Sequence, residues 1–98
     1  MSRFQLTEPS EDDIADLWTY IGADSPDSAD RMVDRILERC AKIARRPGMG
    51  RRRDDLRPGM RCSPVGHYLI FYRLLPDCVE ILRVMSGYRD LEAAFREG

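Results

Sequence analysis

The chain has 98 residues, of which 43% are hydrophobic and 34% charged, and its formal net charge at pH 7 is -1. This length leaves room for one hydrophobic core, so we expect residues 1–98 to form a single domain, and the apolar content excludes a disordered chain. No apolar run approaches the roughly 20 residues of a membrane span. The N-terminus also lacks the pattern of a signal peptide, so we expect a cytoplasmic protein with no membrane partner.

The N-terminal half predicts a short strand followed by two helices. Residues 3–6 alternate in polarity and are typical of a strand. We expect Ser10 to cap the first helix, because an acidic turn follows it and the next apolar positions have helical spacing. Ser25 and Pro26 are typical of the start of a second helix, which Pro47 ends. The short connection predicts an antiparallel helical hairpin whose apolar side covers a sheet.

The second helix has two different faces. Its apolar stripe consists of Ala29, Met32, Val33, Ile36, Leu37, Cys40 and Ile43. The opposite face carries Asp27 with Arg31 and Glu38 with Lys42, both at i, i+4 spacing. Such pairs are typical of a helix surface in water, so we expect this face to be solvated.

The C-terminal half predicts a three-stranded antiparallel meander. Residues 47–59 contain three glycines and two prolines and are expected to form a loop. We expect strands at 60–63, at 68–74, which is apolar on both faces and therefore central, and at 79–85. Residues 91–95 predict a short helix. The fold class is therefore α+β: an N-terminal strand, an antiparallel two-helix hairpin, a three-stranded antiparallel meander and a short C-terminal helix.

The residues of conventional active sites are sparse. The single histidine, His67, has no serine or cysteine partner at a spacing that indicates catalysis, so we expect a strand-edge residue. The three cysteines are odd in number, and no two form a C-x-x-C pair, so we expect reduced, packed thiols. The sequence predicts no metal site and no cofactor.

Positive charge gathers in the middle of the chain. Residues 45–73 carry eight arginines and two aspartates, a net +6, whereas residues 1–44 carry five basic and ten acidic side chains, a net -5. The middle segment is therefore an anion-attracting patch. Its candidate binding residues are Arg51, Arg52, Arg53, Arg57, Arg61 and Arg73. The alternative for residues 51–53 is a solvated loop.

Two arginines lie within otherwise apolar strands, where an unpaired charge is costly. These are Arg61 and Arg83. Each is expected either to reach the rim of the sheet or to meet a carboxylate such as Asp90 or Glu80. A structural ion pair is preferred over an interface role.

Several segments, in this order, resemble the ParE toxins of bacterial type II toxin–antitoxin modules, within the RelE/ParE superfamily. They are DLWTYI (16–21), RP (46–47), GR (50–51), LRPGMR (56–61), YLIFYR (68–73) and RVMSGYRD (83–90). The resemblance implies a compact α+β toxin that poisons DNA gyrase. It also implies a ParD-type antitoxin whose disordered half folds over the toxin and whose other half binds operator DNA, which the toxin then reaches only indirectly.

The superfamily leaves a second function open, a ribosome-dependent mRNA endonuclease of the RelE type. Ser86 and Tyr88 depart from the ParE pattern, and Tyr88 lies near where RelE-type nucleases carry a catalytic aromatic residue. Against this, the net charge is -1 and Lys42 is the only lysine, which fits poorly with entry into an RNA-rich site. We therefore expect a binding toxin, not an enzyme, with Arg83, Tyr88 and Arg89 as recognition residues. A third possibility is an antitoxin-binding protein that has lost its toxicity or has another target.

Overall fold

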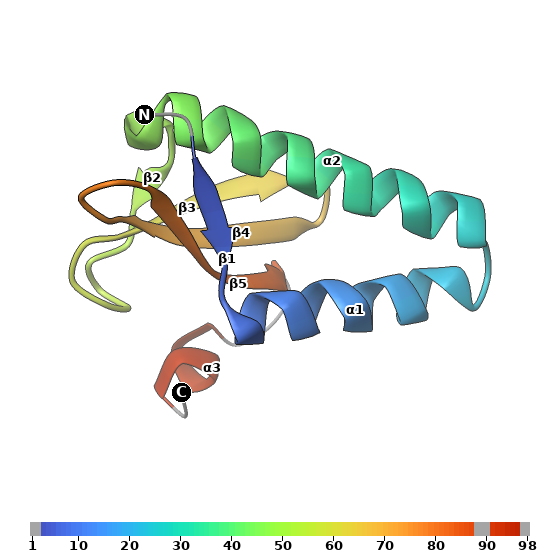
Figure 1. Cartoon of the computed structure of the whole chain (residues 1–98). Coiled ribbons are helices and arrows are strands. Elements are labelled where there is room, and N and C mark those ends of the chain that lie inside the picture. The colour runs from blue at the N-terminus through green and yellow to red at the C-terminus, as the bar shows by residue number, and fades with distance from the viewer. Residues whose placement is uncertain (1–2, 88–90, 97–98) are drawn as a thin grey trace.

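The computed structural model describes residues 3–87 and 91–96, and it contains a five-stranded sheet with two long helices on one face (Figure 1). The sheet has the order β1-β5-β4-β3-β2. The strands are β1 (Phe4–Leu6), β2 (Arg51–Arg52), β3 (Met60–Val65), β4 (Tyr68–Leu74) and β5 (Val79–Ser86). The predicted antiparallel meander of β3, β4 and β5 is confirmed, with β4 in the centre, and so is the α+β class.

The predicted N-terminal strand is confirmed as the edge strand β1, and the opposite edge strand β2 was not predicted. β1 pairs in parallel with β5, Phe4 opposite Val79. β2 lies inside the segment expected to be a loop, after the 3-10 helix η1 (Pro47–Met49), and it pairs only with Arg61 and Cys62 of β3. The beginning of residues 47–59 is therefore ordered by the sheet.

The helical hairpin consists of α1 (Glu8–Gly22) and α2 (Pro26–Arg45). The predicted cap of α2 is confirmed, because the Ser25 hydroxyl accepts from the Ser28 N–H at 3.2 Å. The predicted cap of α1 is wrong: Thr7 is the N-cap. The Thr7 hydroxyl accepts from the Ser10 N–H at 3.3 Å and donates to the Ile81 carbonyl at 2.8 Å, so the same side chain starts the helix and ties it to β5.

The turn between β3 and β4 is shorter than predicted. β3 continues through Pro64 to Val65, and only Gly66 and His67 remain between the strands. Gly66 has a φ of +57°, a conformation that glycine adopts without a Cβ clash. Pro64 is tolerated within the strand because β2 pairs with neither it nor its neighbours, so this part of β3 is an edge of the sheet.

The central strand separates two hydrophobic cores. Ile70 and Tyr72 point to the face that the helical hairpin covers, where they pack with Leu17 and Ile36. Phe71 points to the opposite face, where α3 (Leu91–Arg96) covers it (Figure 1). The core on this second face is formed by Met60, Cys62, Phe71, Met85 and Phe95. In the part of the chain that the structure describes, no helix combines the length and apolar character that a membrane crossing needs.

Candidate functional site

The arginine loop, residues 51–61, neutralises much of its own charge. Arg52 forms an ion pair with Asp54 at 2.9 Å, and Arg53 holds Asp55 through two hydrogen bonds of 3.1 and 3.0 Å. The Gly59 N–H also donates to Asp54 at 2.9 Å, and this bond, followed by the Arg52 hydrogen bond, lowers the pKa of Asp54. Two of the predicted binding arginines are therefore engaged by the two aspartates that follow them in sequence.

Arg57 and Arg61 hold neighbouring parts of the fold. The guanidinium of Arg57 lies 5.4 Å from the centre of the Phe95 ring and donates to the Phe95 carbonyl at 3.4 Å, which attaches α3 to the loop. Arg61 donates to the Gly50 carbonyl at 2.7 Å. The expected carboxylate partner of Arg61 is thus replaced by a backbone oxygen of the segment just before β2.

The same backbone segment is anchored from the core side by Tyr72. Its hydroxyl accepts from the Gly50 N–H at 2.8 Å and donates to the Pro47 carbonyl at 2.7 Å. Burial raises the pKa of Tyr72, so the phenol stays protonated and able to donate. A Cβ on Gly50 would lie 2.8 Å from the tyrosine ring, so only glycine lets the chain pass this close.

Arg83 forms the ion pair that the sequence predicted, but with an unforeseen partner. Its guanidinium holds Asp13 of α1 at 2.7 and 2.9 Å, which raises the pKa of Arg83. The same carboxylate accepts from the Val84 N–H at 2.9 Å, beyond the point where β1 stops pairing with β5. Glu80, one of the expected partners, pairs instead with Arg73 at 2.7 Å.

The sequence also singled out Arg51, His67, Tyr88, Arg89 and Asp90. Arg51 lies exposed in β2, and His67 lies exposed in the turn, next to the first residue of β4. Tyr88, Arg89 and the carboxylate of Asp90 lie outside the described residues.

The cysteines Cys40, Cys62 and Cys78 are buried, as predicted. Burial raises the pKa of Cys40 to about 12, so this thiol carries no appreciable thiolate at neutral pH. Within residues 3–87 and 91–96, no three His, Cys, Asp or Glu side chains are placed to hold a metal ion.

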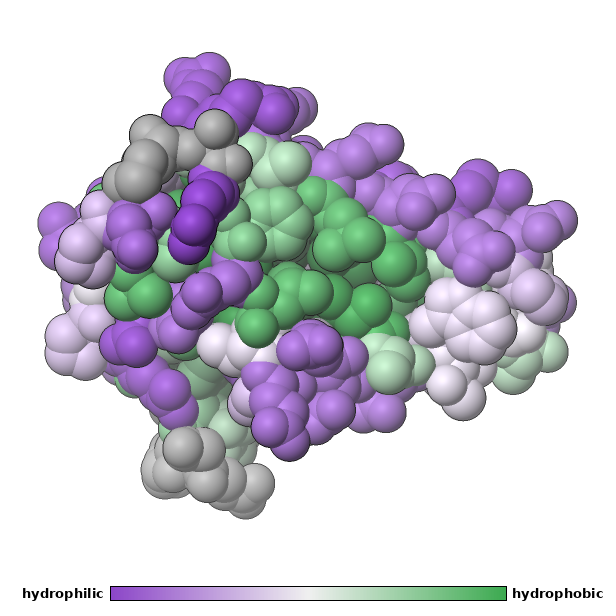
Figure 2. Space-filling view, in the orientation of Figure 1, coloured by the Kyte–Doolittle hydropathy of each residue, from purple (hydrophilic) through white to green (hydrophobic). Residues whose placement is uncertain are grey.

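An apolar groove runs between the two helices of the hairpin and the end of β1 (Figure 2). Its volume is about 360 Å³, and its lining residues are Leu6, Glu11, Ile14, Ala15, Trp18, Val33 and Leu37. The helix periodicity placed Leu37 on the covered stripe of the second helix, yet it is 36% exposed, and Trp18 of α1 is 40% exposed. The indole N–H of Trp18 donates to Asp30 at 2.8 Å, which orients the ring from α1 toward α2. Exposed apolar side chains gathered in a groove are typical of a protein-binding surface.

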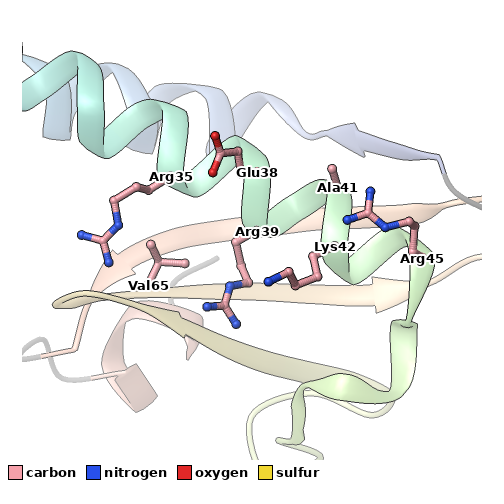
Figure 3. Close-up of a pocket in the computed structure, with 7 residues that line it drawn as sticks. All are labelled: Arg35, Glu38, Arg39, Ala41, Lys42, Arg45 and Val65. Atoms are coloured by element: carbon pink, nitrogen blue, oxygen red, sulfur yellow. The ribbon is translucent and has the colours of Figure 1, made fainter.

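A second groove, of opposite character, lies on the other side of α2 against β3 (Figure 3). Its volume is about 430 Å³, and its lining residues are Arg35, Glu38, Arg39, Ala41, Lys42, Arg45 and Val65. Four cations and one carboxylate give this groove a net +3. The sequence analysis placed Glu38 and Lys42 on a solvated face and did not identify a groove there. The signal that could have revealed it is the spacing of the basic residues along one side of the helix.

Comparisons with known proteins converge on one family. The profile of the family described as ParE toxin of type II toxin-antitoxin system, parDE, matches residues 4–91. Toxin ParE1 of Caulobacter vibrioides is 33% identical and the match covers 87% of this chain and 88% of that protein. Toxin RelE3 of the same organism is 31% identical over 86% of this chain and 92% of its own. A solved structure of the chromosomal ParDE TA system from P. aeruginosa has a TM-score of 0.74 at 21% identity, covers 88% of this chain and 96% of that one, and shares the fold.

Proposed function

We infer that this chain, which belongs to the ParE toxins of type II toxin–antitoxin systems, inhibits DNA gyrase in the cytoplasm by binding it and is neutralised by a ParD-type antitoxin. The observation that carries the antitoxin partner is the apolar groove between α1 and α2. The family supports the toxin role, and the engagement of the strand arginines supports binding over catalysis.

The helical hairpin offers the apolar groove to an amphipathic segment. A helix that buries its apolar face in such a groove is a recurrent mode of peptide recognition, and large exposed aromatic side chains supply most of the affinity. Trp18 of α1 and Leu37 of α2 belong to the same lining. An antitoxin segment with apolar residues at helical spacing therefore matches this surface in shape and chemistry.

The strand arginines support a binding mechanism because each contacts a different part of the fold. Arg61 holds the backbone of Gly50, Arg73 pairs with Glu80, and Arg83 pairs with Asp13. A ribonuclease that works without a metal gathers cations, a base and an acid around one phosphate. The described strand arginines instead diverge, with their charges held by the protein.

The antitoxin proposal is tested by isothermal titration with the cognate ParD-type antitoxin that the proposal requires. We expect Trp18→Ala to weaken binding by about thirty-fold or more, the loss of a central aromatic contact worth about 2 kcal/mol. Tyr20→Ala is the matched control, because Tyr20 is on the same helix, is 79% exposed and does not line the groove. Equal effects of the two changes would exclude the groove as the binding surface.

The target is tested with purified toxin in a DNA gyrase supercoiling and cleavage-complex assay, run beside a translation assay. We expect loss of supercoiling with intact translation. The similarity to Toxin RelE3 makes mRNA cleavage on the ribosome the second candidate. Arrest of translation with unaffected gyrase would establish that candidate in place of the first.

A further inference from the structure

The cation row of α2 places four positive charges along one helix. It consists of Arg35, Arg39, Lys42 and Arg45, which follow one side of the helix over residues 35–45. The ion pairs of the described residues join Arg52, Arg53, Arg73 and Arg83 to carboxylates and include no member of this row. Its four charges are therefore available to an outside anion.

Three of the four cations extend toward the same side of α2 (Figure 3). Figure 3 shows Arg35, Arg39 and Lys42 extending from α2 toward the side where Val65 of β3 lies, with the Glu38 carboxylate pointing away. The Arg35 guanidinium lies over the β3–β4 turn, within 3.6 Å of where a Cβ on Gly66 would stand. The cations thus line a hollow bounded by the helix and the edge strand (Figure 3).

The neighbouring strand edge is unsuited to adding a peptide strand. β2 covers only Arg61 and Cys62, so β3 is open beyond them, but Pro64 there has no N–H to donate. A proline on an edge strand interrupts the hydrogen-bond ladder that an added strand needs. Recognition in this groove must therefore rest on charge rather than on strand pairing.

The lining favours a nucleic-acid backbone over a protein partner. Protein interfaces combine arginine with apolar and aromatic anchors, whereas this groove offers only Ala41 and Val65 besides its charged residues. The anchors lie instead in the apolar groove on the other side of α2. Residues 35–45 span about 15 Å of helix, and each B-DNA strand carries one phosphate per about 3.4 Å of axis, so four cations match roughly four phosphates.

We propose that the groove between α2 and β3 binds the phosphate backbone of double-stranded DNA without reading its sequence. Arg35, Arg39 and Arg45 would hold phosphate oxygens through their planar forks and Lys42 would act as a point charge. A toxin with its apolar groove filled would keep this second groove open, because the two lie on opposite sides of α2. The proposal concerns the toxin's own contact with DNA, and it does not depend on gyrase being the target.

The test is fluorescence anisotropy of the full chain with a labelled duplex of arbitrary sequence, over about 20 to 200 mM salt. We expect weak binding. A plot of the logarithm of the association constant against the logarithm of the salt concentration should have a slope of about -3 to -4, because each of four phosphates contributes about -0.9. The double variant Arg39→Gln with Lys42→Gln should reduce the size of the slope by about 2. Both positions are on the helix surface, and circular dichroism checks that the variant folds.

Arg31→Gln is the matched control. It removes one charge from the same helix at an exposed position that bonds Ser28 and does not line the groove, so the slope should stay unchanged. Absence of duplex binding at the lowest salt would overturn the proposal, as would an Arg31→Gln effect equal to that of the double variant. Tighter binding of a labelled glutamate-rich peptide than of the duplex would show a protein site instead. If the gyrase assay shows no inhibition of supercoiling, the expected results of the duplex-binding experiment do not change. Failure of the gyrase proposal and failure of the DNA-binding proposal are therefore distinguishable.

Discussion

The arginine loop and the cation row of α2 are both positively charged, but in the described structure only the arginines of the loop are bound to other parts of the protein. In the loop, Arg52 and Arg53 are held by Asp54 and Asp55, while Arg57 and Arg61 hold α3 and the segment before β2. On α2, the cations form no described ion pair and line a hollow. A dense run of arginine in a sequence therefore indicates local structure as readily as an outside ligand, and the available charge lies where the described residues form no ion pair.

Among the arginines that are bound to other parts of the protein, we expect removal of Arg83 to have the largest effect on stability. Arg83→Ala should lower the free energy of unfolding by about 2–4 kcal/mol, because it leaves the Asp13 carboxylate, 10% exposed, without its cation. Urea denaturation measures the loss. Arg52→Ala is the control, and since its pair is exposed it should cost less than about 1 kcal/mol. If Arg83→Ala also lowered the free energy of unfolding by less than about 1 kcal/mol, the ion pair with Asp13 would not be structural.

Gly50 tests whether the base of the arginine loop is as tightly fixed as its contacts indicate. Gly50→Ala should cost about 1–3 kcal/mol, because the new Cβ meets the Tyr72 ring at 2.8 Å. Gly48→Ala is the matched control two residues earlier, where a Cβ meets nothing within 4 Å. Thermal unfolding of the two variants compares them directly. Similar melting temperatures would mean that the segment moves away from Tyr72 without cost.

The titration of Asp54 tests how the loop charges are held. Its carboxyl resonance should titrate below the usual value of 3.8, because the Gly59 N–H and Arg52 both lower the pKa of Asp54. A lowered folded pKa stabilises the protein above the unfolded pKa, and this contribution is lost as pH falls through the folded value. In Arg52→Gln the midpoint should rise yet stay below 3.8, since the Gly59 bond is the larger cause. A full return to 3.8 would reverse that order.

We expect the smallest effect on stability from changes in the cation row of α2. Arg39→Gln with Lys42→Gln should change the free energy of unfolding by less than about 0.5 kcal/mol, because neither side chain pairs within the described structure. Chemical denaturation of this variant beside Arg83→Ala separates charges that the fold uses from charges that it does not. A loss of 2 kcal/mol or more would place the cation row among the structural arginines and remove the reason to assign it a ligand.

Elements whose signals are local could be predicted from the sequence. The cap of α2 depends on Ser25 and Pro26, which are adjacent, and the meander depends on apolar alternation interrupted by short turns. The cap of α1 could not be chosen from local pattern alone. Both Thr7 and Ser10 have capping hydroxyls, and Thr7 also bonds the carbonyl of Ile81, which is distant in the chain.

What the sequence by itself determined is the α+β class, the helical hairpin, the central strand and the preference of Arg83 for an ion pair. Only the tertiary structure decided that this carboxylate is Asp13, that β1 runs parallel to β5, and which positive charges remain available. The physical reason is range. Helix periodicity and turns arise among neighbouring residues, whereas an ion pair between α1 and β5, or a groove between α2 and β3, exists only after distant segments have packed together.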